Sequence, residues 1–227
     1  MLHQIGPNIW EIARPIRNTK FNIGTRMTIV RLADGGLWIH SPVKFDQPLR
    51  AAVDHLGPVK FIVAPNQYHH LFVTPWIEAY PLAAFCCVSD LLKKRPELRP
   101  TIVLDRIDVQ QLPWTDSLKT CIVRGSRMFT EGDFLHIPSR TLIITDFAFN
   151  IPPQPSTFFN LFLKVWGVYN RFSPSRLLRA FCRDREEVRR CYQIMAAWDF
   201  DRIVLAHGSI VTSGGKQKFQ SAFGWLQ

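Results

Sequence analysis

Three short apolar runs, far apart in the chain, each precede residues that can bind a metal ion. The pairs are residues 61–64 with His69 and His70, residues 141–144 with Asp146, and residues 203–206 with His207. Apolar runs of this length, bounded by turn residues, are typical of strands that are buried on both faces of a sheet. Ligands of open α/β sheets usually lie at the carboxyl ends of such strands. The sequence therefore predicts that side chains from three strand ends meet at one site.

These candidate ligands form a mixed nitrogen and oxygen set. They are His69, His70, Asp146 and His207. Such a set suits zinc or iron, and we expect zinc rather than iron. Each residue alone is also compatible with an ordinary polar side chain at a strand end, because satisfied histidines outnumber metal ligands. The four together favour a shared site for a divalent metal.

The overall composition is that of a globular protein. The chain has 227 residues, of which 47% are hydrophobic, and we predict a single domain over residues 1–227. Five cysteines without a CxxC pair favour neither a disulfide framework nor a cysteine zinc site and indicate a reducing compartment. The N-terminus lacks a secretory signal pattern, and no apolar run reaches the roughly 18 residues of a membrane span. We therefore expect a cytoplasmic protein.

The formal net charge of +10 is concentrated in two basic groups. One contains Lys93, Lys94, Arg95 and Arg99, and the other contains Arg171, Arg176, Arg179, Arg183, Arg185, Arg189 and Arg190. Such groups can indicate nucleic acid, an anionic membrane surface or acidic substrates. They are also compatible with solvated helical faces, because no nucleic-acid-binding module accompanies them. Nucleic-acid binding is therefore not expected.

The pattern along the chain predicts a mixture of strands and helices. Residues 1–43 are β-rich, and residues 45–56 have apolar side chains at helical spacing before Gly57 and Pro58. A strand, this helix and the strand at 61–64 form a unit that normally gives parallel pairing. Further strands are predicted at 83–89, 102–105, 119–123 and 134–137, the last in a hairpin with 141–144. Further helices are predicted at 74–80, from 89 onward, at 185–198 with Ile194 on its apolar face, and within 216–226.

Residues 151–184 break this alternation and form an aromatic and basic insertion. A proline-rich linker leads to residues 158–169, which are densely apolar but too short to cross a bilayer as a helix. Three interpretations stay open: a core or lid helix, a dimer surface, or an interfacial membrane helix with basic flanks. The corresponding partners through 158–190 are a second copy of the chain or an anionic membrane surface. On the last interpretation the protein is peripheral at a membrane.

Four short motifs, in their order and spacing, resemble the metallo-β-lactamase superfamily and, within it, an uncharacterised family. They are His40-Ser41-Pro42, Pro65-Asn66 with His69-His70, residues 141–146, and His207-Gly208. The similarity spans most of the chain. It implies an α/β fold, a metallo-β-lactamase-like αββα sandwich, with metal ligands on loops between the sheets.

The sequence also departs from the superfamily's His-x-His-x-Asp-His signature. If His70 is aligned with the last histidine, His69 takes the place of the aspartate, and Pro65 and Gln67 take those of the first two histidines. The superfamily's middle Gly-His most nearly matches Gly125-Ser126. The resemblance therefore implies that the first of two metal sites is lost.

The second metal site of the superfamily keeps candidate ligands in this chain. By the resemblance they are His69, His70, Asp146 and His207, which would hold one metal. We expect His40 and Asn66 to lie behind the ligands and to orient them by hydrogen bonds. No general acid or base is assigned, and we interpret Glu131 and Asp133 as exposed turn residues.

A single-metal site with an open position favours hydrolysis. Zinc can lower the pKa of a bound water towards ~7. Loss of one ion argues against phosphodiester cleavage, so we expect an ester, lactone or amide of a small molecule as the substrate. The alternative is a degenerate, non-catalytic fold that serves as a binding or membrane-surface module, with the histidines as polar core residues.

Overall fold

The first half of the chain forms a seven-stranded sheet in the computed structural model, which describes residues 1–16 and 23–227. Its strands, in sheet order, are β1 (His3–Gly6), β2 (Ile9–Arg14), β3 (Thr25–Arg31), β4 (Leu37–His40), β5 (Val59–Ala64), β6 (Ala84–Cys87) and β7 (Ile102–Val103). Pairing is antiparallel from β1 to β4 and parallel from β4 to β7. This confirms the β-rich start and the parallel unit predicted around β5.

The second half contributes a four-stranded sheet and a small two-stranded one. In sheet order the larger contains β13 (Arg202–Leu205), β10 (Thr141–Ile144), β9 (Glu131–His136) and β8 (Leu118–Val123). β8, β9 and β10 are antiparallel, whereas β10 and β13 are parallel. The smaller sheet pairs β11 (Phe149–Asn150) with β12 (Phe172–Ser173). The predicted hairpin of β9 and β10 is thus present.

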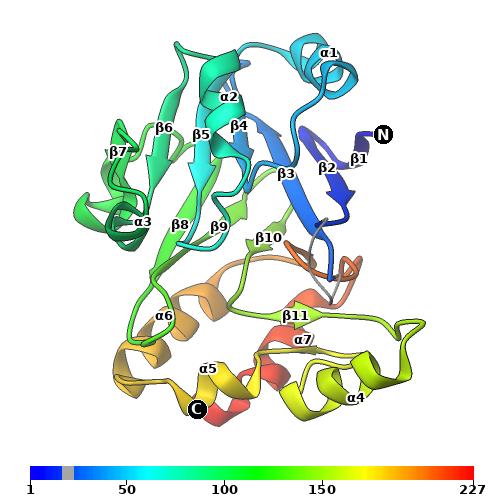
Figure 1. Ribbon diagram of the computed structural model, residues 1–227. Helices are drawn as coiled ribbons and strands as arrows, with labels where there is room; N and C mark the ends of the chain where they lie inside the picture. Colours follow the sequence, from blue (N-terminus) through cyan, green and yellow to red (C-terminus); the bar gives the residue numbers. More distant parts are fainter. Residues whose placement is uncertain (17–22) are drawn as a thin grey trace.

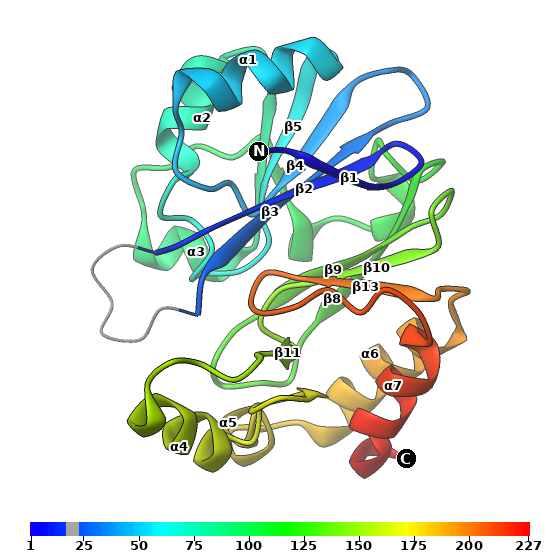
Figure 2. The same cartoon turned by 90° about the vertical axis from the view of Figure 1, so that its right-hand side faces the viewer.

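The helices cover the outer faces of the two large sheets (Figures 1 and 2). α1 (Gln47–Leu56) and α2 (Val73–Ala79) lie on the first sheet, and α3 (Ser89–Lys94) lies near its β7 edge. α6 (Arg185–Ala197) and α7 (Gly215–Ala222) lie on the second sheet, with α4 (Thr157–Trp166) and α5 (Arg176–Ala180) beside them. Short 3-10 helices span Leu104–Arg106, Val109–Gln111 and Gly224–Leu226. The order of layers confirms the predicted αββα sandwich.

Successive residues of the central strands point into different apolar cores. On β5, Ile62 and Ala64 pack in the core under α1 and α2, whereas Val63 packs between the two sheets. On β10, Leu142 and Ile144 pack under α6 and α7, whereas Ile143 faces the other sheet. Because the side-chain period of a strand is two residues, an unbroken apolar run fills both cores at once. This explains why these runs predicted strands buried on both faces.

Residues 151–184 form α4, β12 and α5. Helix α4 begins at Ser156, whose Oγ accepts a hydrogen bond from the backbone N–H of Phe159, and it ends at Gly167 in the left-handed region with φ of +87°. Phe159 and Leu163 anchor one side of α4 in a small apolar cluster with β11. No helix among the described residues is long and apolar enough to cross a bilayer.

The interpretation of Glu131 and Asp133 as exposed turn residues is wrong. Both lie on β9 and are fully buried. Strand β9 begins three residues earlier than predicted, because its pairing with β8 continues as far as Val123 opposite Glu131. Ile194 of α6 is also 49% exposed rather than buried, since it lies about 100° around the helix from the buried Met195.

Replacing Asp133 with asparagine should stabilise the protein, and more so at higher pH. Burial and the negative charge of Glu131 raise the pKa of Asp133 well above its usual value. A carboxyl whose pKa is raised in the folded state destabilises the fold increasingly above its unfolded pKa of about 3.9. We expect Asp133→Asn to raise the thermal midpoint by about 2–4 °C at pH 8 and by less at pH 5. An equal or larger gain at pH 5 would contradict this assignment.

Candidate metal centre

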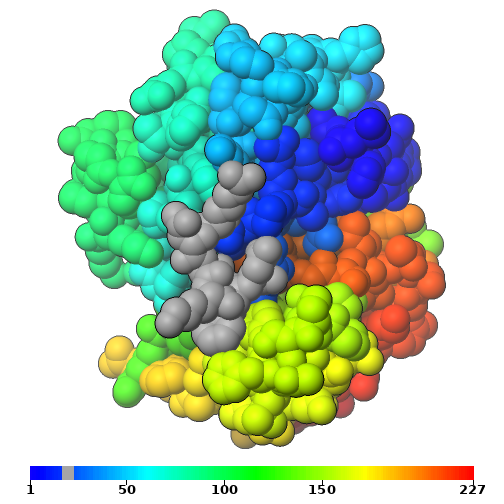
Figure 3. All heavy atoms as spheres, turned by 45° about the vertical axis from the view of Figure 1, so that its right-hand side comes forward, coloured from blue at the N-terminus to red at the C-terminus, as the bar shows by residue number. Residues whose placement is uncertain are grey.

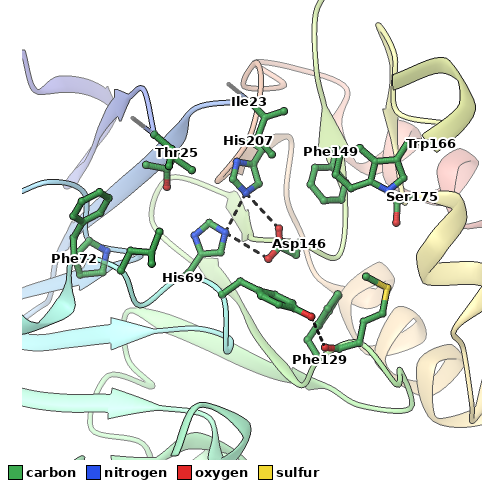
Figure 4. A pocket seen from close by; sticks show the side chains of 15 residues that line it. Ile23, Thr25, His69, Phe72, Phe129, Asp146, Phe149, Trp166, Ser175 and His207 are labelled. Carbon is green, nitrogen blue, oxygen red and sulfur yellow. Dashed lines mark hydrogen bonds and ion pairs between the residues drawn. The ribbon is translucent and has the colours of Figure 1, made fainter. Parts of the chain in front are cut away.

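The side chains of His69, Asp146 and His207 meet from three strand ends (Figure 4). Nε2 of His69 lies 3.1 Å from Nε2 of His207 and 3.5 Å from Oδ2 of Asp146. Nε2 of His207 lies 3.4 Å from Oδ1 of Asp146. Within residues 1–16 and 23–227, this is the one group of three or more His, Cys, Asp or Glu side chains whose candidate ligand atoms all lie within 4.8 Å of one another. The structure therefore brings together three of the four ligands predicted from the sequence.

Backbone hydrogen bonding fixes which nitrogen of His207 faces this group. Nδ1 of His207 lies 2.6 Å from the carbonyl oxygen of Gly24. Because a carbonyl oxygen can only accept, Nδ1 carries a hydrogen, and Nε2 is the nitrogen that faces Asp146 and His69. The ring of His69 is held similarly, with its Nδ1 2.6 Å from Oγ of Ser41. Both imidazoles thus direct Nε2 inward.

The charge states favour a cation between these three side chains. Burial lowers the pKa of His69, which favours its neutral form. Burial alone would raise the pKa of Asp146, but the imidazoles of His69 and His207 hold it well below its usual range. The ionised carboxylate of Asp146 and the Nε2 atoms of both imidazoles therefore converge in a buried place, where a negative charge needs a positive partner. A bound cation would be such a partner.

The separations fit a zinc-sized ion. Ligand atoms about 2.0–2.1 Å from a tetrahedral zinc ion lie about 3.3–3.4 Å apart. The three separations in this centre are 3.1, 3.4 and 3.5 Å. Two imidazoles and one carboxylate also suit ferrous iron. The centre therefore has the donor atoms and the spacing of a single-ion site.

Asp146 is held in place by a buried network that sequence analysis found only in part. Nδ2 of Asn66 donates to Oδ2 of Asp146 at 2.8 Å and to Oε2 of Glu131 at 2.6 Å. The carboxylate of Glu131 also accepts from the backbone N–H groups of Thr145, Asp146 and Phe147, at 3.1, 2.8 and 3.0 Å. Burial and the charge of Asp146 raise the pKa of Glu131 to about 7. Alternate residues of a strand point to the same face, so Glu131 lies on the same face of β9 as the buried Leu135, and this spacing could have predicted its burial.

His207 is held from the first sheet by Arg26 on β3. The guanidinium of Arg26 donates to the carbonyl oxygens of Leu205 and Gly208, at 2.5 and 2.9 Å, on either side of His207. Its charge is balanced by Glu11, at 2.8 Å. Gly208 has φ of +82°, and a Cβ there would lie 2.2 Å from the carbonyl oxygen of Asn150. The glycine after His207 is therefore required by close backbone contact.

His70 does not reach the three candidate ligands. Its Nδ1 lies 3.1 Å from Nη1 of Arg95. Burial and the charges of Lys94 and Arg95 lower the pKa of His70 to about 4, so the neutral ring accepts this hydrogen bond. The turn after β5 causes the separation, because Oδ1 of Asn66 accepts from the N–H groups of Tyr68 and His69 and directs His69 alone inward.

His40 contacts a residue next to a candidate ligand rather than a ligand itself. Its Nε2 is 3.3 Å from Oγ1 of Thr145, and its ring stacks on Trp38 with centroids 5.4 Å apart. Burial lowers the pKa of His40 to about 3, so the ring is neutral. His40 therefore supports the residue before Asp146, whereas Asn66 contacts Asp146 itself.

The positions aligned with the superfamily's other histidines are engaged elsewhere. Nε2 of Gln67 donates to the carbonyl oxygen of Met128, and Oγ of Ser126 accepts from the N–H of Met128. The carbonyl oxygen of Pro65 accepts from the N–H of Gly132. Gln67 and Pro65 thus join the turn after β5 to the chain around β9, and none of the three residues offers an imidazole.

An apolar cavity of about 280 Å³ opens beside the three candidate ligands (Figure 4). Its walls include Pro42, Phe72, Phe129, Phe149 and Trp166. The ring of Phe149 stacks on His207 with centroids 5.8 Å apart and contacts Trp166 at 5.0 Å. A molecule bound at the centre would therefore have apolar surfaces around it.

A family model described as DUF4336, a domain of unknown function, matches residues 7–171. The chain belongs to the DUF4336 family. No curated protein matches this DUF4336 chain. Its fold, however, is shared with solved structures.

Three of these structures illustrate the likeness. DIM-1 metallo-β-lactamase has a TM-score of 0.66 at 11% identity over 100% of this chain and 98% of its own. FIM-1 metallo-β-lactamase from Pseudomonas aeruginosa, in its mono-zinc form, has a TM-score of 0.65 at 12% identity over 100% and 94%. The metal-soaked Flv1 flavodiiron core from Synechocystis sp. PCC6803 has a TM-score of 0.66 at 11% identity over 100% and 60%. The likeness confirms the metallo-β-lactamase superfamily fold that the sequence motifs implied.

Replacing Glu131 with glutamine should loosen the loop that carries Asp146. At pH 8, above the Glu131 pKa of about 7, the substitution removes a charged acceptor of three backbone N–H groups, and hydrogen bonds to charged groups contribute about 1.5–3 kcal/mol each. We expect Glu131→Gln to lower the free energy of unfolding by about 2–4 kcal/mol in urea denaturation. Asp133→Asn, which also changes a carboxylate to an amide two residues along β9, is the matched control and should not lower the free energy of unfolding. Equal losses in both variants would contradict the role of Glu131.

Proposed function

We propose that the protein is a single-metal hydrolase that acts on an ester, lactone or amide of a small molecule. The convergence of Nε2 of His69, Nε2 of His207 and the carboxylate of Asp146 carries this proposal. A divalent ion held by such a set supplies a Lewis acid and lowers the pKa of a bound water to about 7. That is the chemistry which ester and amide hydrolysis requires at neutral pH.

Each group around the centre has a distinct task in this proposal. His69 and His207 bind through Nε2, and Ser41 and the Gly24 carbonyl orient their rings from Nδ1. Asp146 supplies the carboxylate, which Asn66 orients by a direct hydrogen bond. The arrangement keeps the ligand atoms in position before any substrate binds.

The cavity supports a small substrate with an apolar part. Its volume of about 280 Å³ is near the lower end of known ligand pockets, which span about 300–1,000 Å³. Phe72, Phe149 and Trp166 would contact an acyl or aromatic group while the polar end faces the metal ligands. A single ion lacks the clamp with which two-metal sites hold both oxygens of a phosphodiester. Carboxylic esters, lactones and amides therefore fit better than phosphodiesters.

Metal analysis tests the proposed ligands. Protein purified without a histidine tag and supplied with zinc or ferrous iron is expected to hold about one ion per chain, measured by inductively coupled plasma mass spectrometry. Replacement of His69, Asp146 or His207 by alanine should remove at least nine tenths of that ion in each case. His70→Ala is the matched control and should keep it, because His70 faces Arg95. Metal loss on His70→Ala, or a wild-type protein that takes up neither ion, would contradict the ligand set.

A substrate panel tests the reaction. Nitrophenyl esters from acetate to octanoate, aryl lactones and anilides should include at least one substrate whose hydrolysis depends on the metal. His207→Ala should lower kcat/KM by ~10³-fold. Trp166→Ala enlarges the cavity and should shift the preference to longer acyl groups, seen as a lower KM for octanoate relative to acetate. Fully metal-loaded protein that cleaves no member of the panel would contradict the hydrolase proposal.

A further inference from the structure

Helices α4 and α5 present large apolar side chains to solvent on one part of the surface. On α4, four exposed residues recur at intervals of three and four: Phe158, Leu161, Phe162 and Val165. This spacing places them on one side of the helix, while Phe159 and Leu163 anchor the other side in the core. Helix α5 adds Leu177 and Phe181, which are 41% and 46% exposed. We call these six residues the apolar stripe.

The same segment is strongly cationic. Between Phe147 and Arg183 the chain has no acidic residue and five basic ones: Lys164, Arg171, Arg176, Arg179 and Arg183. These five residues account for half of the formal net charge of +10 in a short part of the chain. The apolar stripe therefore lies within a segment of one charge sign.

The arginines gather next to the carboxyl end of α4. Nε of Arg171 donates to the carbonyl oxygen of Gly167 at 3.0 Å, and Nη1 of Arg176 donates to that of Val165 at 3.2 Å. Burial and the like charges of Arg171 and Arg176 lower the pKa of Arg179. Among the residues that the structure describes, none of these three guanidinium groups forms an ion pair with a carboxylate. Their charge is therefore available to an anionic partner.

We propose that the surface formed by α4 and α5 docks on an anionic lipid bilayer. Helices that lie in a membrane interface combine an apolar face of Phe, Leu and Trp with Lys and Arg beside it. The apolar stripe would enter the boundary between headgroups and acyl chains, and the guanidinium groups would contact lipid phosphates. The segment around α4 lies at the lower front of the molecule in Figure 3, on its outer surface.

Charge argues against a second copy of the chain as the partner. A symmetric dimer through this surface would bring two clusters of uncompensated arginines together, and like charges across an interface are unfavourable. An anionic bilayer offers the opposite sign over a wide area. An anionic lipid surface therefore matches the charge of α4 and α5 better than a second copy of the chain does.

The docking surface is continuous with the metal centre through aromatic rings. Phe149 stacks on His207, Trp166 contacts Phe149 at 5.0 Å, and Phe162 contacts Trp166 at 5.5 Å. Phe162 belongs to the apolar stripe, whereas Phe149 and Trp166 line the cavity. Docking would therefore bring the cavity close to the bilayer.

Vesicle sedimentation tests the proposal with the full chain. The probes are vesicles of phosphatidylcholine alone and vesicles with about one third phosphatidylglycerol. The protein should sediment with the anionic vesicles at least tenfold more than with the neutral ones. The binding should fall by at least tenfold between 50 mM and 500 mM salt, since surface charges are screened. Equal binding to both vesicles, or binding to neither, would overturn the proposal.

Two pairs of substitutions separate the apolar and the charged contributions. Leu161→Gln with Val165→Gln should abolish most of the binding, and both residues are exposed, so the fold should remain. Arg176→Gln with Arg179→Gln should weaken binding by roughly 25-fold, because each basic residue near an anionic surface contributes roughly fivefold in affinity. The matched control is Lys93→Gln with Arg99→Gln, which removes the same charge around α3, away from α4 (Figure 1). Equal weakening by the control pair would overturn the assignment to α4 and α5.

Two measurements distinguish membrane docking from dimer formation and from the proposed hydrolysis. Light scattering after size exclusion should give a monomer, and a dimer that dissociates in the Leu161→Gln, Val165→Gln variant would overturn the proposal in favour of a dimer surface. His207→Ala should bind anionic vesicles as the wild type does, because His207 belongs to the metal centre rather than to the docking surface. Vesicle binding can thus fail or succeed whatever the outcome for hydrolysis.

Discussion

The amide of Asn66 joins the two sheets at the point where the candidate ligands meet. Asn66 follows β5 of the first sheet, whereas its two acceptors are Glu131, on β9 of the second sheet, and Asp146, just after β10 of that sheet. The other end of the same amide accepts from the N–H groups of Tyr68 and His69 and shapes the turn that directs His69 inward. One side chain therefore sets the positions of a histidine and a carboxylate that are 77 residues apart in the sequence.

Much of the fold was predictable because the sequences of its central strands indicate that both of their faces are buried. The runs at β5, β10 and β13 are apolar on consecutive residues, which only strands covered on both faces can accommodate. The start of β9 was not predictable in this way, because Glu131 and Asp133 are charged residues of a kind that is rarely buried. Glu131 is buried because it accepts hydrogen bonds from Asn66 and from the chain around Asp146, and local sequence does not reveal such distant partners.

The candidate site was predictable in its residue types and less so in its geometry. Three strand ends did deliver His69, Asp146 and His207 to one place. His69 and His70 are neighbours of the same type, and only the turn made by Asn66 decides which of them faces the centre. The carbonyl of Gly24 and the guanidinium of Arg26, which orient and hold His207, are contacts across more than 170 residues. No local pattern encodes either contact.

Anomalous X-ray diffraction from crystals of metal-loaded protein, measured at the zinc and iron absorption edges, would locate the ion and identify its ligands. We expect one anomalous peak, bound by Nε2 of His69, Nε2 of His207 and the carboxylate of Asp146, with His70 still beside Arg95. A peak bound by other residues, or none after loading with either metal, would contradict this expectation.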